Sequence, residues 1–199
     1  SPEEIGGLDG AEHLLDCAGR QIYRVTLGAA DGAHRCFTYQ FTNHSWGRSL
    51  RRCYAFRSLH TSLRLGRSGF HTLEVLAALK RRGDVLNWTS LLIAREIEGV
   101  SELPSTGQHV FQVHSCLELT EELGKRLGEH LASFHRAGFF HGDLKTRHIL
   151  VSTTAPGEYL FYFVDLEKCV HFPKFPGHFG VFLAARDLIQ LFASLQVNP

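Results

Sequence analysis

The sequence predicts an α+β protein in which a small antiparallel sheet precedes a mainly helical region. Two early segments, 21–27 and 35–41, alternate well enough for strands, and a turn-like stretch at 28–32 joins them into a hairpin. Longer segments that we expect to be helical follow at 121–137 and 181–195. Strands that come before helices are typical of the α+β class.

Composition sets limits on the class of protein. The 199 residues suffice for one substantial domain or two small lobes, and 44% hydrophobic content is ordinary for a globular protein. A net charge of +1 gives no general attraction to nucleic acid. The five cysteines lack metal-ligand spacing, and no signal peptide or membrane-spanning run is visible. These features favour a cytoplasmic protein with reduced thiols.

The rest of the first half alternates between helix and strand signals. Residues 11–17 can form a short helix. A confident helix is expected over Ser68–Arg82, with Ser68 as N-cap, apolar residues at helical spacing, and Gly83 just past the end. A strand follows at Thr89–Ile97, and the turn-like 98–101 stretch after it predicts a connector.

An arginine-rich segment lies upstream of that helix, between Trp46 and Arg67. Aromatic residues are interleaved with its arginines, which are Arg48, Arg51, Arg52, Arg57, Arg64 and Arg67. Paired guanidinium nitrogens suit phosphorylated or anionic partners. A solvated cationic loop is the plain alternative, and nucleic acid is a weaker one.

The second half centres on two loops that each carry an aspartate. Thr120 can cap a helix over 121–137, which would hold the following turn from a rigid base. The run His141–Val151 predicts a turn that presents Asp143 and then a strand, and the apolar strand 159–164 delivers Asp165 at its end. Adjacent strands would bring the two carboxylates near one site. Alternatively, Asp143 only caps a polar turn.

The spacing of these loops resembles the catalytic and metal-binding loops of kinases. Gly142 after His141, and His148 at the usual asparagine position, are most similar to the lipopolysaccharide core (Kdo/heptose) kinase family. This resemblance implies a two-lobed protein-kinase-like fold with a minimal second lobe. Residues 1–98 would form the nucleotide-binding lobe, and residues 99–199 would carry the catalytic and metal-binding loops.

The resemblance also implies a role for each polar residue of the two loops. Asp143 would be the catalytic base, and Lys145 would direct an ammonium group at the migrating phosphoryl group. Asp165 would be the principal metal ligand, with His148 as the second. ATP and Mg²⁺ are the implied cofactors, and Mn²⁺ is an alternative because imidazole is a softer ligand than an amide oxygen. His141 would bond to the backbone near Asp165, and Asp187 resembles the helical aspartate that braces the catalytic loop.

The nucleotide-binding lobe departs from the kinase pattern. Kinases carry a phosphate-gripping lysine on the second hairpin strand, where Tyr39 and Gln40 stand here. Glu74, on the expected helix, would be the acidic partner of that lysine, with Arg24 or one of the arginines just upstream of the helix as a substitute cation. An exposed helix glutamate is the alternative. Glu96 and Glu98 are candidates to contact adenine through main-chain atoms.

The resemblance implies an acceptor as well. It points to a hydroxyl of a lipopolysaccharide core sugar or related anionic glycolipid, with Arg48–Arg67 contacting the substrate or the inner face of the cytoplasmic membrane. A pseudokinase that binds nucleotide or a partner is the alternative favoured by the uncharged Tyr39 and Gln40. A small-molecule or protein kinase is a third possibility, because the acceptor loop at 169–180 does not reveal its substrate.

Overall fold

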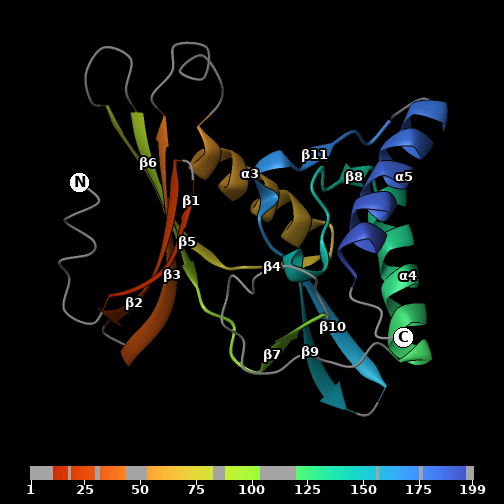
Figure 1. The fold of residues 1–199 in the computed structure, drawn as a ribbon, viewed down its shortest axis with the longest axis horizontal. Coiled ribbons are helices and arrows are strands. Elements are labelled where there is room, and N and C mark those ends of the chain that lie inside the picture. Colours follow the sequence, from red (N-terminus) through yellow and green to blue (C-terminus); the bar gives the residue numbers. More distant parts are fainter. Residues whose placement is uncertain are drawn as a thin grey trace. The chain divides into compact units, whose positions relative to one another are not determined.

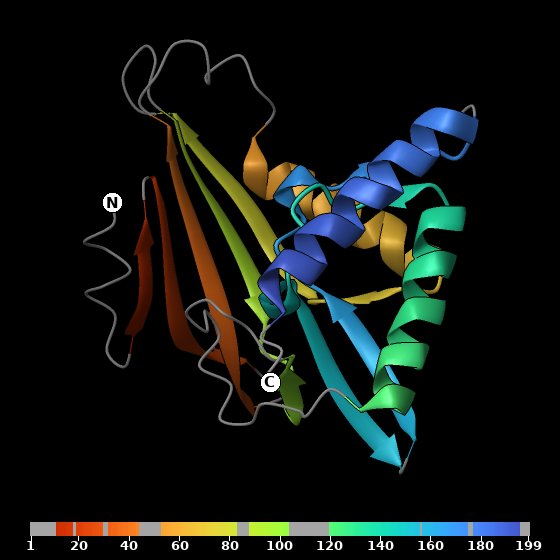
Figure 2. The same cartoon turned by 45° about the vertical axis from the view of Figure 1, so that its right-hand side comes forward.

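The computed structural model divides the chain into two compact units (Figures 1 and 2). The first unit is Ser1–Ser62 with Leu73–Ile97, and the second is Leu63–Thr72 with Glu98–Pro199. The structure describes residues 11–17, 19–29, 32–43, 53–82, 88–103, 120–155, 157–174 and 177–195. The predicted assignment of 1–98 and 99–199 to separate functions stays a prediction.

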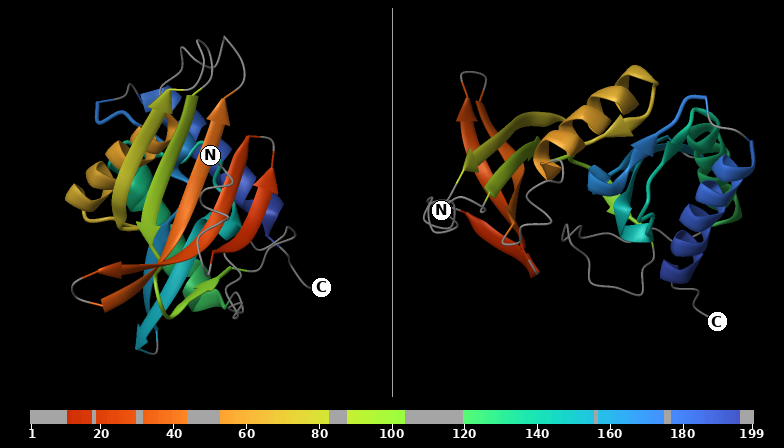
Figure 3. Two further views of the ribbon diagram at one scale, coloured as in Figure 1. Left: turned by 90° about the vertical axis from the view of Figure 1, so that its left-hand side faces the viewer. Right: turned by 90° about the horizontal axis from the view of Figure 1, so that it is seen from above.

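The first unit contains a five-stranded antiparallel sheet, which the left panel of Figure 3 shows face on. Its spatial order is β1-β2-β3-β6-β5. The strands are β1 (Glu12–Cys17), β2 (Arg20–Ala29), β3 (Gly32–Asn43), β5 (Val75–Arg82) and β6 (Trp88–Arg95). The hairpin predicted from the alternating segments is therefore confirmed as β2 and β3, and the strand predicted after it is β6.

Strand β3 is the centre of this sheet. It pairs with β2 on one side and with β6 on the other, and all its residues from 36 to 41 are buried. Successive side chains alternate between faces, so Tyr39 and Phe41 share one face and Gln40 lies on the other. Phe41 contacts Tyr54 of helix α3 (Tyr54–Arg67), with ring centroids 5.7 Å apart. Tyr39 therefore belongs to the face on which α3 begins.

The helix predicted over 11–17 is wrong, because residues 12–17 form strand β1. This strand pairs with β2, from Glu12 opposite Arg24 to Cys17 opposite Arg20. A helix of one or two turns is marginal in water, whereas the edge of a sheet satisfies the backbone of a short segment through hydrogen bonds to its neighbour.

The helix predicted over Ser68–Arg82 is also wrong. The helix of this region, α3, ends at Arg67, and Ser68 follows its end, where its N–H donates to Arg64 O at 3.1 Å. Gly69 then turns the chain with a φ of 82°, a conformation that favours glycine. The serine that we interpreted as a helix start thus belongs to a helix end.

Residues 71–72 and 75–82 form strands β4 (His71–Thr72) and β5 instead. The sequence of β5, Val-Leu-Ala-Ala-Leu-Lys-Arg-Arg, consists mostly of good helix formers. Pairing with β6 overrides this propensity, and an irregular register between Val75 and Ala77 disturbs the alternation that would have indicated a strand. Short apolar runs do not distinguish helix from strand by period alone.

The second unit combines a four-stranded sheet with two helices. The sheet order is β4-β10-β9-β7, and a separate two-stranded sheet pairs β8 with β11. The elements are β7 (Val100–Glu102), α4 (Glu121–Arg136), β8 (Phe139–Phe140), η1 (Thr146–His148), β9 (Ile149–Ala155), β10 (Glu158–Phe163), η2 (Leu166–Lys168), β11 (Val170–His171) and α5 (Gly177–Ser194). The two helices and two strands predicted here are confirmed.

Helix α4 supplies much of the core of this unit. Thr120 caps it as predicted, since its hydroxyl accepts a hydrogen bond from Leu123 N at 3.2 Å. One face is buried, comprising Leu123, Leu127, Leu131 and Phe134. The ring of Phe134 packs 4.3 Å from that of Phe163 on β10. Burial of each such side chain is worth about 1.5–3 kcal/mol, so the turn after α4 starts from a fixed base.

None of the helices in the described ranges combines the length and the apolar character needed to cross a bilayer.

Candidate active site

Asp187 of α5 holds the start of the loop that carries Asp143. Its Oδ2 accepts from His141 N at 2.7 Å, and its Oδ1 accepts from Gly142 N at 2.9 Å. The carboxylate is fully buried, and burial would raise its pKa. Hydrogen bonds from His135 and from the two amides outweigh burial and lower the pKa, so Asp187 stays ionised. The structure thus confirms the bracing contact predicted for Asp187.

The same face of α5 continues to hold the loop further along. Gln190 Oε1 accepts from Leu144 N at 3.2 Å, and Ser194 Oγ accepts from Thr146 N at 2.9 Å. Residues three, four and seven apart lie on one side of a helix, so Asp187, Gln190 and Ser194 form a row of acceptors. Polar residues at this spacing in an apolar helix are the signal by which Gln190 and Ser194 could have been found.

Gly142 lets the loop pass very close to the short helix η2. Its φ is 80°, and a Cβ at this position would lie 2.7 Å from the carbonyl oxygen of Lys168. Both the conformation and the contact exclude a larger side chain without a shift of the backbone. Glycine after His141 therefore brings η2 against the Asp143 loop.

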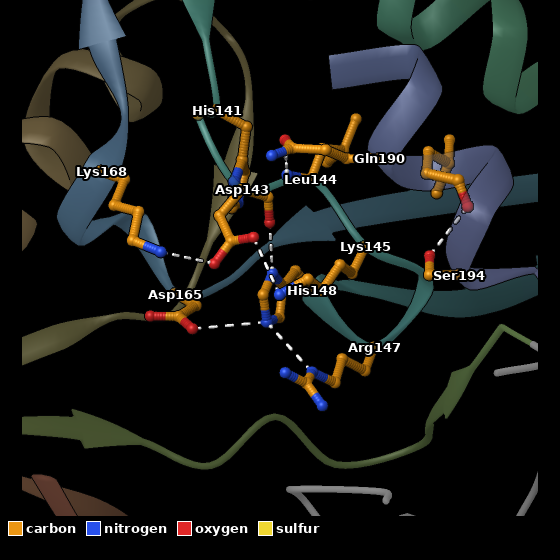
Figure 4. A network of polar contacts seen from close by, with 12 residues as sticks. His141, Asp143, Leu144, Lys145, Arg147, His148, Asp165, Lys168, Gln190 and Ser194 are labelled. Atoms are coloured by element: carbon orange, nitrogen blue, oxygen red, sulfur yellow. Dashed lines mark hydrogen bonds and ion pairs between the residues drawn. The ribbon is translucent and has the colours of Figure 1, made fainter. Parts of the chain in front are cut away.

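The carboxylate of Asp143 lies between two lysines (Figure 4). Lys145 Nζ is 2.9 Å from Oδ1, and Lys168 Nζ is 2.8 Å from Oδ2. Burial would raise the pKa of Asp143, but hydrogen bonds from the two ammonium groups, with their charges, hold it well below its usual range. Asp143 is therefore an ionised carboxylate at neutral pH. The sequence predicted Lys145 at this site but assigned no role to Lys168.

His148 connects the two aspartates (Figure 4). Its Nδ1 is 2.6 Å from the backbone oxygen of Asp143, and its Nε2 is 3.3 Å from Asp165 Oδ2. A carbonyl oxygen only accepts hydrogen bonds, so Nδ1 carries the proton and Nε2 presents its lone pair. Arg147 Nε donates to the same Nε2 at 3.3 Å.

The imidazole of His148 is neutral over the physiological range. Burial lowers its pKa to about 4, although the negative charge of Asp165 acts in the opposite direction. His148 Nε2 and Asp165 Oδ2 are therefore two acceptor atoms 3.3 Å apart, and the cationic Arg147 donates to Nε2.

Asp165 has an unusual backbone conformation. With φ 59° and ψ 52°, it is the one non-glycine residue in the described ranges with a positive φ. Such left-handed conformations are uncommon for non-glycine residues, and strain of this kind is concentrated at functional sites.

His148 and Asp165 fit a divalent cation of the Mg²⁺ or Mn²⁺ type. Magnesium is held by few protein ligands and completes its shell with water and substrate phosphates, whereas imidazole also suits manganese. Within the described ranges, the structure contains no group of three or more histidine, cysteine or acidic residues arranged to hold a metal. A divalent cation on this pair alone would need water or substrate phosphates to complete its shell.

His141 has a structural place beside these residues. It is fully buried, and its Nε2 bonds to the backbone oxygen of Val164 at 2.9 Å. Its ring also stacks on His148, with centroids 5.6 Å apart. This confirms the predicted contact with the backbone just before Asp165.

The residues predicted to bind nucleotide lie mostly in the first unit. Glu74 sits between β4 and β5 and not on a helix, and it is exposed, with its Oε2 2.8 Å from Arg95 Nε. Arg24, the predicted substitute cation for Glu74, is 2.7 Å from Glu12 and 3.3 Å from Glu96 instead. We predicted Glu74 to pair with a cation because we expected it on a helix, and no helix is present at Glu74.

Glu96, Glu98 and Tyr39 have different environments. Glu96 accepts ion pairs from Arg24 and Arg35, and its N–H donates to Arg35 O at 2.9 Å. Glu98 is exposed in a turn of the second unit, and Tyr39 is buried in β3. Their roles in nucleotide binding stay predictions.

Helix α3 contains no acidic residue that could pair with a lysine on β3. Its sequence, Tyr-Ala-Phe-Arg-Ser-Leu-His-Thr-Ser-Leu-Arg-Leu-Gly-Arg, contains no aspartate or glutamate. In kinases an ion pair between a β3 lysine and a helix glutamate positions the nucleotide phosphates. Here β3 has no lysine and α3 has no carboxylate, so both members of that pair are missing from these elements.

Comparison with known proteins agrees with the kinase-like features of this site. The sequence profile of the lipopolysaccharide kinase (Kdo/WaaP) family matches residues 12–195. Among curated proteins, 3-deoxy-D-manno-octulosonic acid kinase from Vibrio vulnificus (strain CMCP6) is 27% identical over 127 residues, 64% of this chain and 49% of the relative. The chain therefore spans about half the length of that relative.

Two solved structures share the fold. WaaP in complex with acyl carrier protein has a TM-score of 0.62 and 20% identity, over 96% of this chain and 73% of that one. The Rio2 kinase–ADP/Mg²⁺–phosphoaspartate complex from Chaetomium thermophilum has a TM-score of 0.50 and 13% identity, over 93% of this chain and 56% of that one. The predicted protein-kinase-like fold is thus confirmed, and the chain belongs to the lipopolysaccharide kinase (Kdo/WaaP) family.

Proposed function

We propose that this protein is an ATP- and divalent-metal-dependent kinase that phosphorylates a hydroxyl of a lipopolysaccharide core sugar or related glycolipid. Family membership supports the reaction and the class of acceptor. The observation that carries the proposal is the ionised carboxylate of Asp143, held by Lys145 and Lys168 beside the His148–Asp165 pair. Phosphoryl transfer depends mostly on positioning and charge neutralisation, and this cluster supplies both.

Asp143 orients the acceptor hydroxyl and receives its proton. Because its pKa is held low, it is a weak base, and it accepts the proton only as the hydroxyl oxygen bonds to phosphorus. The hydrogen bonds that the loop amides donate to Asp187, Gln190 and Ser194 fix the backbone from which the Asp143 carboxylate projects. Lys145 places positive charge next to the reacting groups.

His148 Nε2 and Asp165 hold the divalent cation. When bound, the cation neutralises negative charge on the nucleotide phosphates. The neutral imidazole is ready to bind at physiological pH, although Arg147 Nε must leave Nε2 first. We expect Mn²⁺ to support activity at least as well as Mg²⁺, and a strict preference for Mg²⁺ in a metal titration would contradict a ligand role for His148.

The nucleotide and the acceptor use further parts of the chain. Residues 1–98 form the nucleotide-binding lobe, and residues 99–199 the catalytic lobe. Glu96 already uses its N–H, so its carbonyl and Glu98 are the main-chain candidates for adenine.

The Arg48–Arg67 segment contacts the anionic glycolipid or the inner face of the cytoplasmic membrane. Its residues 48–52 lie outside the described part of the chain. Arg64 and Arg67 are exposed on α3 and could take part in such a contact.

A catalytically weak pseudokinase is the second candidate. The specific observation in its favour is the loss of both members of the lysine–glutamate pair, from β3 and from α3. The two candidates differ in whether phosphate transfer occurs, because either could bind nucleotide.

Calorimetry of ATP binding, with and without Mg²⁺ or Mn²⁺, tests the proposal first. Metal-dependent binding that is lost in Asp165→Ala and weakened in His148→Ala supports it, and Glu129→Ala on the exposed face of α4 serves as control. Transfer of labelled phosphate to lipopolysaccharide core sugars then separates the kinase from the pseudokinase. Metal-dependent binding without transfer to any core acceptor would favour the pseudokinase or a kinase for another acceptor class.

A further inference from the structure

Lys168 is an unexpected second cation at the catalytic carboxylate. It is the last residue of η2, three positions after Asp165, and its Nζ is 2.8 Å from Asp143 Oδ2. Lys145 already neutralises the other oxygen at 2.9 Å. Two ammonium groups thus contact one carboxylate at the place where a phosphoryl group would react.

The backbone around Lys168 is fixed by several contacts. Gly142 lets the carbonyl of Lys168 approach the Asp143 loop, and β11, directly after η2, pairs with β8, directly before the loop. Cys169 N donates to Leu166 O at 3.1 Å and closes the turn. The position of the Lys168 backbone beside the Asp143 loop is therefore built into the second unit.

The side chain itself remains accessible. It is 55% exposed, compared with 17% for Asp143. An ion pair this exposed contributes only about 0–1 kcal/mol to stability, so stability is a weak reason for the lysine. A partly exposed ammonium group on a fixed backbone is instead suited to exchange one anionic partner for another.

A cation is also needed for the chemistry proposed above. Kinases grip the nucleotide phosphates with the β3 lysine, and β3 of this chain has none. The partner carboxylate is missing from α3 as well. Among the described residues, Lys168 is a cation that the reaction, as derived from Lys145, His148 and Asp165, does not yet use.

We propose that Lys168 is a catalytic residue that contacts the transferring phosphoryl group, an inference that rests on the proposed kinase function. The acceptor hydroxyl, on binding Asp143, displaces the ammonium of Lys168 from Oδ2. The displaced ammonium then binds the non-bridging oxygens of the γ-phosphate, where negative charge is spread in the transition state.

The chemical step balances without a further reagent. The acceptor oxygen forms a bond to the γ-phosphorus of ATP, and the bond between that phosphorus and the β,γ-bridging oxygen breaks to release ADP. The hydroxyl proton passes to the carboxylate of Asp143. Lys168 keeps its protons throughout and acts only through charge and hydrogen bonding.

Steady-state transfer by Lys168→Met, Lys168→Arg and the parent protein tests this role. Lys125→Met, which removes an exposed lysine from α4, is the matched control. We expect Lys168→Met to lower kcat by roughly 10²–10³-fold, as for other lost transition-state donors, with the Kd of ATP changed less than about threefold. Lys168→Arg should recover at least about a tenth of the parent kcat, because it restores the positive charge.

Binding of ADP with Mg²⁺ and aluminium fluoride provides a readout that does not require turnover. This planar anion mimics the phosphoryl group in flight, so Lys168→Met should lose affinity for it by a factor similar to the loss in kcat. Affinity for ADP alone should stay within about threefold of the parent, whereas a purely structural role for Lys168 would weaken both ligands alike.

Three outcomes decide the matter. A loss in kcat matched by a loss of aluminium fluoride affinity supports the role of Lys168. Active parent protein with Lys168→Met within about threefold in kcat overturns this inference and leaves the kinase proposal in place. Parent protein that transfers no phosphate to any core acceptor overturns the kinase proposal, and this inference with it.

Discussion

The loop around Asp143 is fixed by hydrogen bonds to α5, and strand β3 is fixed by pairing with β2 and β6, yet the two regions differ in the charged side chains that they carry. The loop keeps an ionised aspartate, two lysines and a histidine next to a second aspartate. Strand β3 is buried between β2 and β6, but presents Tyr39 and Gln40 where a kinase would have its lysine. The difference teaches that one kinase-like chain can keep the charged residues of its Asp143 loop while β3 lacks the lysine of the kinase pattern.

The pattern of loss in the first unit supports this separation. A lysine missing alone would leave its carboxylate partner unpaired, but α3 contains no carboxylate at all. Loss of both members avoids a buried, unpaired charge, which would be costly. Strand β3 and helix α3 thus carry neither charge of that pair, while the second unit has an additional cation, Lys168, beside Asp143.

The largest expected effect on the Asp143 loop is that of Asp187→Ala. The change removes both acceptors from His141 N and Gly142 N, and it leaves these backbone groups without their partners. We expect the free energy of unfolding to fall by about 3–5 kcal/mol, measured by urea denaturation. Ser194→Ala should cost less, about 1 kcal/mol, because it removes a neutral hydroxyl. Equal effects of the two changes would contradict the central role of Asp187.

Tyr39→Lys tests the nucleotide-gripping side. The new ammonium would be buried on the face of the sheet where α3 begins, and α3 offers no carboxylate. We expect a loss of about 3 kcal/mol in stability and no gain in ATP affinity by calorimetry. Tyr39→Phe, which keeps the ring, is the control. A tenfold gain in ATP affinity from Tyr39→Lys would show that only the lysine had been lost.

Two glycines with almost the same φ, Gly142 and Gly157, test how closely the Asp143 loop approaches η2. Gly142 has a φ of 80° and a Cβ there would meet Lys168 O at 2.7 Å, whereas Gly157 has a φ of 79° and open space. Gly157→Ala should cost about 1–2 kcal/mol for its left-handed conformation. Gly142→Ala should cost at least about 1 kcal/mol more and should also reduce activity, because η2 must shift. Equal stability of the two variants would mean that the loop and η2 do not approach so closely.

The smallest expected effect is a pH dependence of stability due to His148. Burial lowers its pKa from 6.5 to about 4, so at intermediate pH the unfolded chain binds a proton that the folded protein does not. Stability from this group is present above about pH 6.5 and is lost as the pH falls towards about 4. Half-buried His130, whose pKa desolvation also lowers to about 4, contributes a slope of the same sign.

Urea unfolding at several pH values measures this slope. His148→Gln should reduce it between pH 6.5 and 4, and His130→Gln should reduce it by a comparable amount. An unchanged slope in His148→Gln would mean that His148 is not held in its neutral form.

The side chains that meet around Asp143 could be predicted from the sequence because their signals are local. Asp143, Lys145, His148 and Asp165 lie in two short runs joined by a hairpin, so their order along the chain already places them together. Asp187 was recognised from a three-residue pattern on an expected helix. Lys168 could not be assigned, because its contact with Asp143 depends on the close passage of two backbones at Gly142.

The first unit was harder to predict because tertiary pairing overrides local preference there. Residues 75–82 are good helix formers, yet they pair with β6 and form an edge strand of the sheet. The helix of this region, α3, lies within the arginine-rich segment. Its buried residues are Ala55, Ser58, Ser62 and Leu65. Those residues repeat at helical spacing, and this was the signal that could have found α3.

Transfer of labelled phosphate from ATP to a lipopolysaccharide core sugar, by the parent protein and by Asp143→Asn, tests the central claim most directly. The parent should transfer phosphate despite the missing β3 lysine. Asp143→Asn should be slower by roughly 10²–10⁴-fold while binding ATP with similar affinity, because the proton acceptor is lost and the residues proposed to hold the nucleotide are unchanged. Asp143→Asn that matches the parent rate, or a parent protein that binds ATP and transfers nothing, would contradict the claim that the second unit carries the catalytic chemistry.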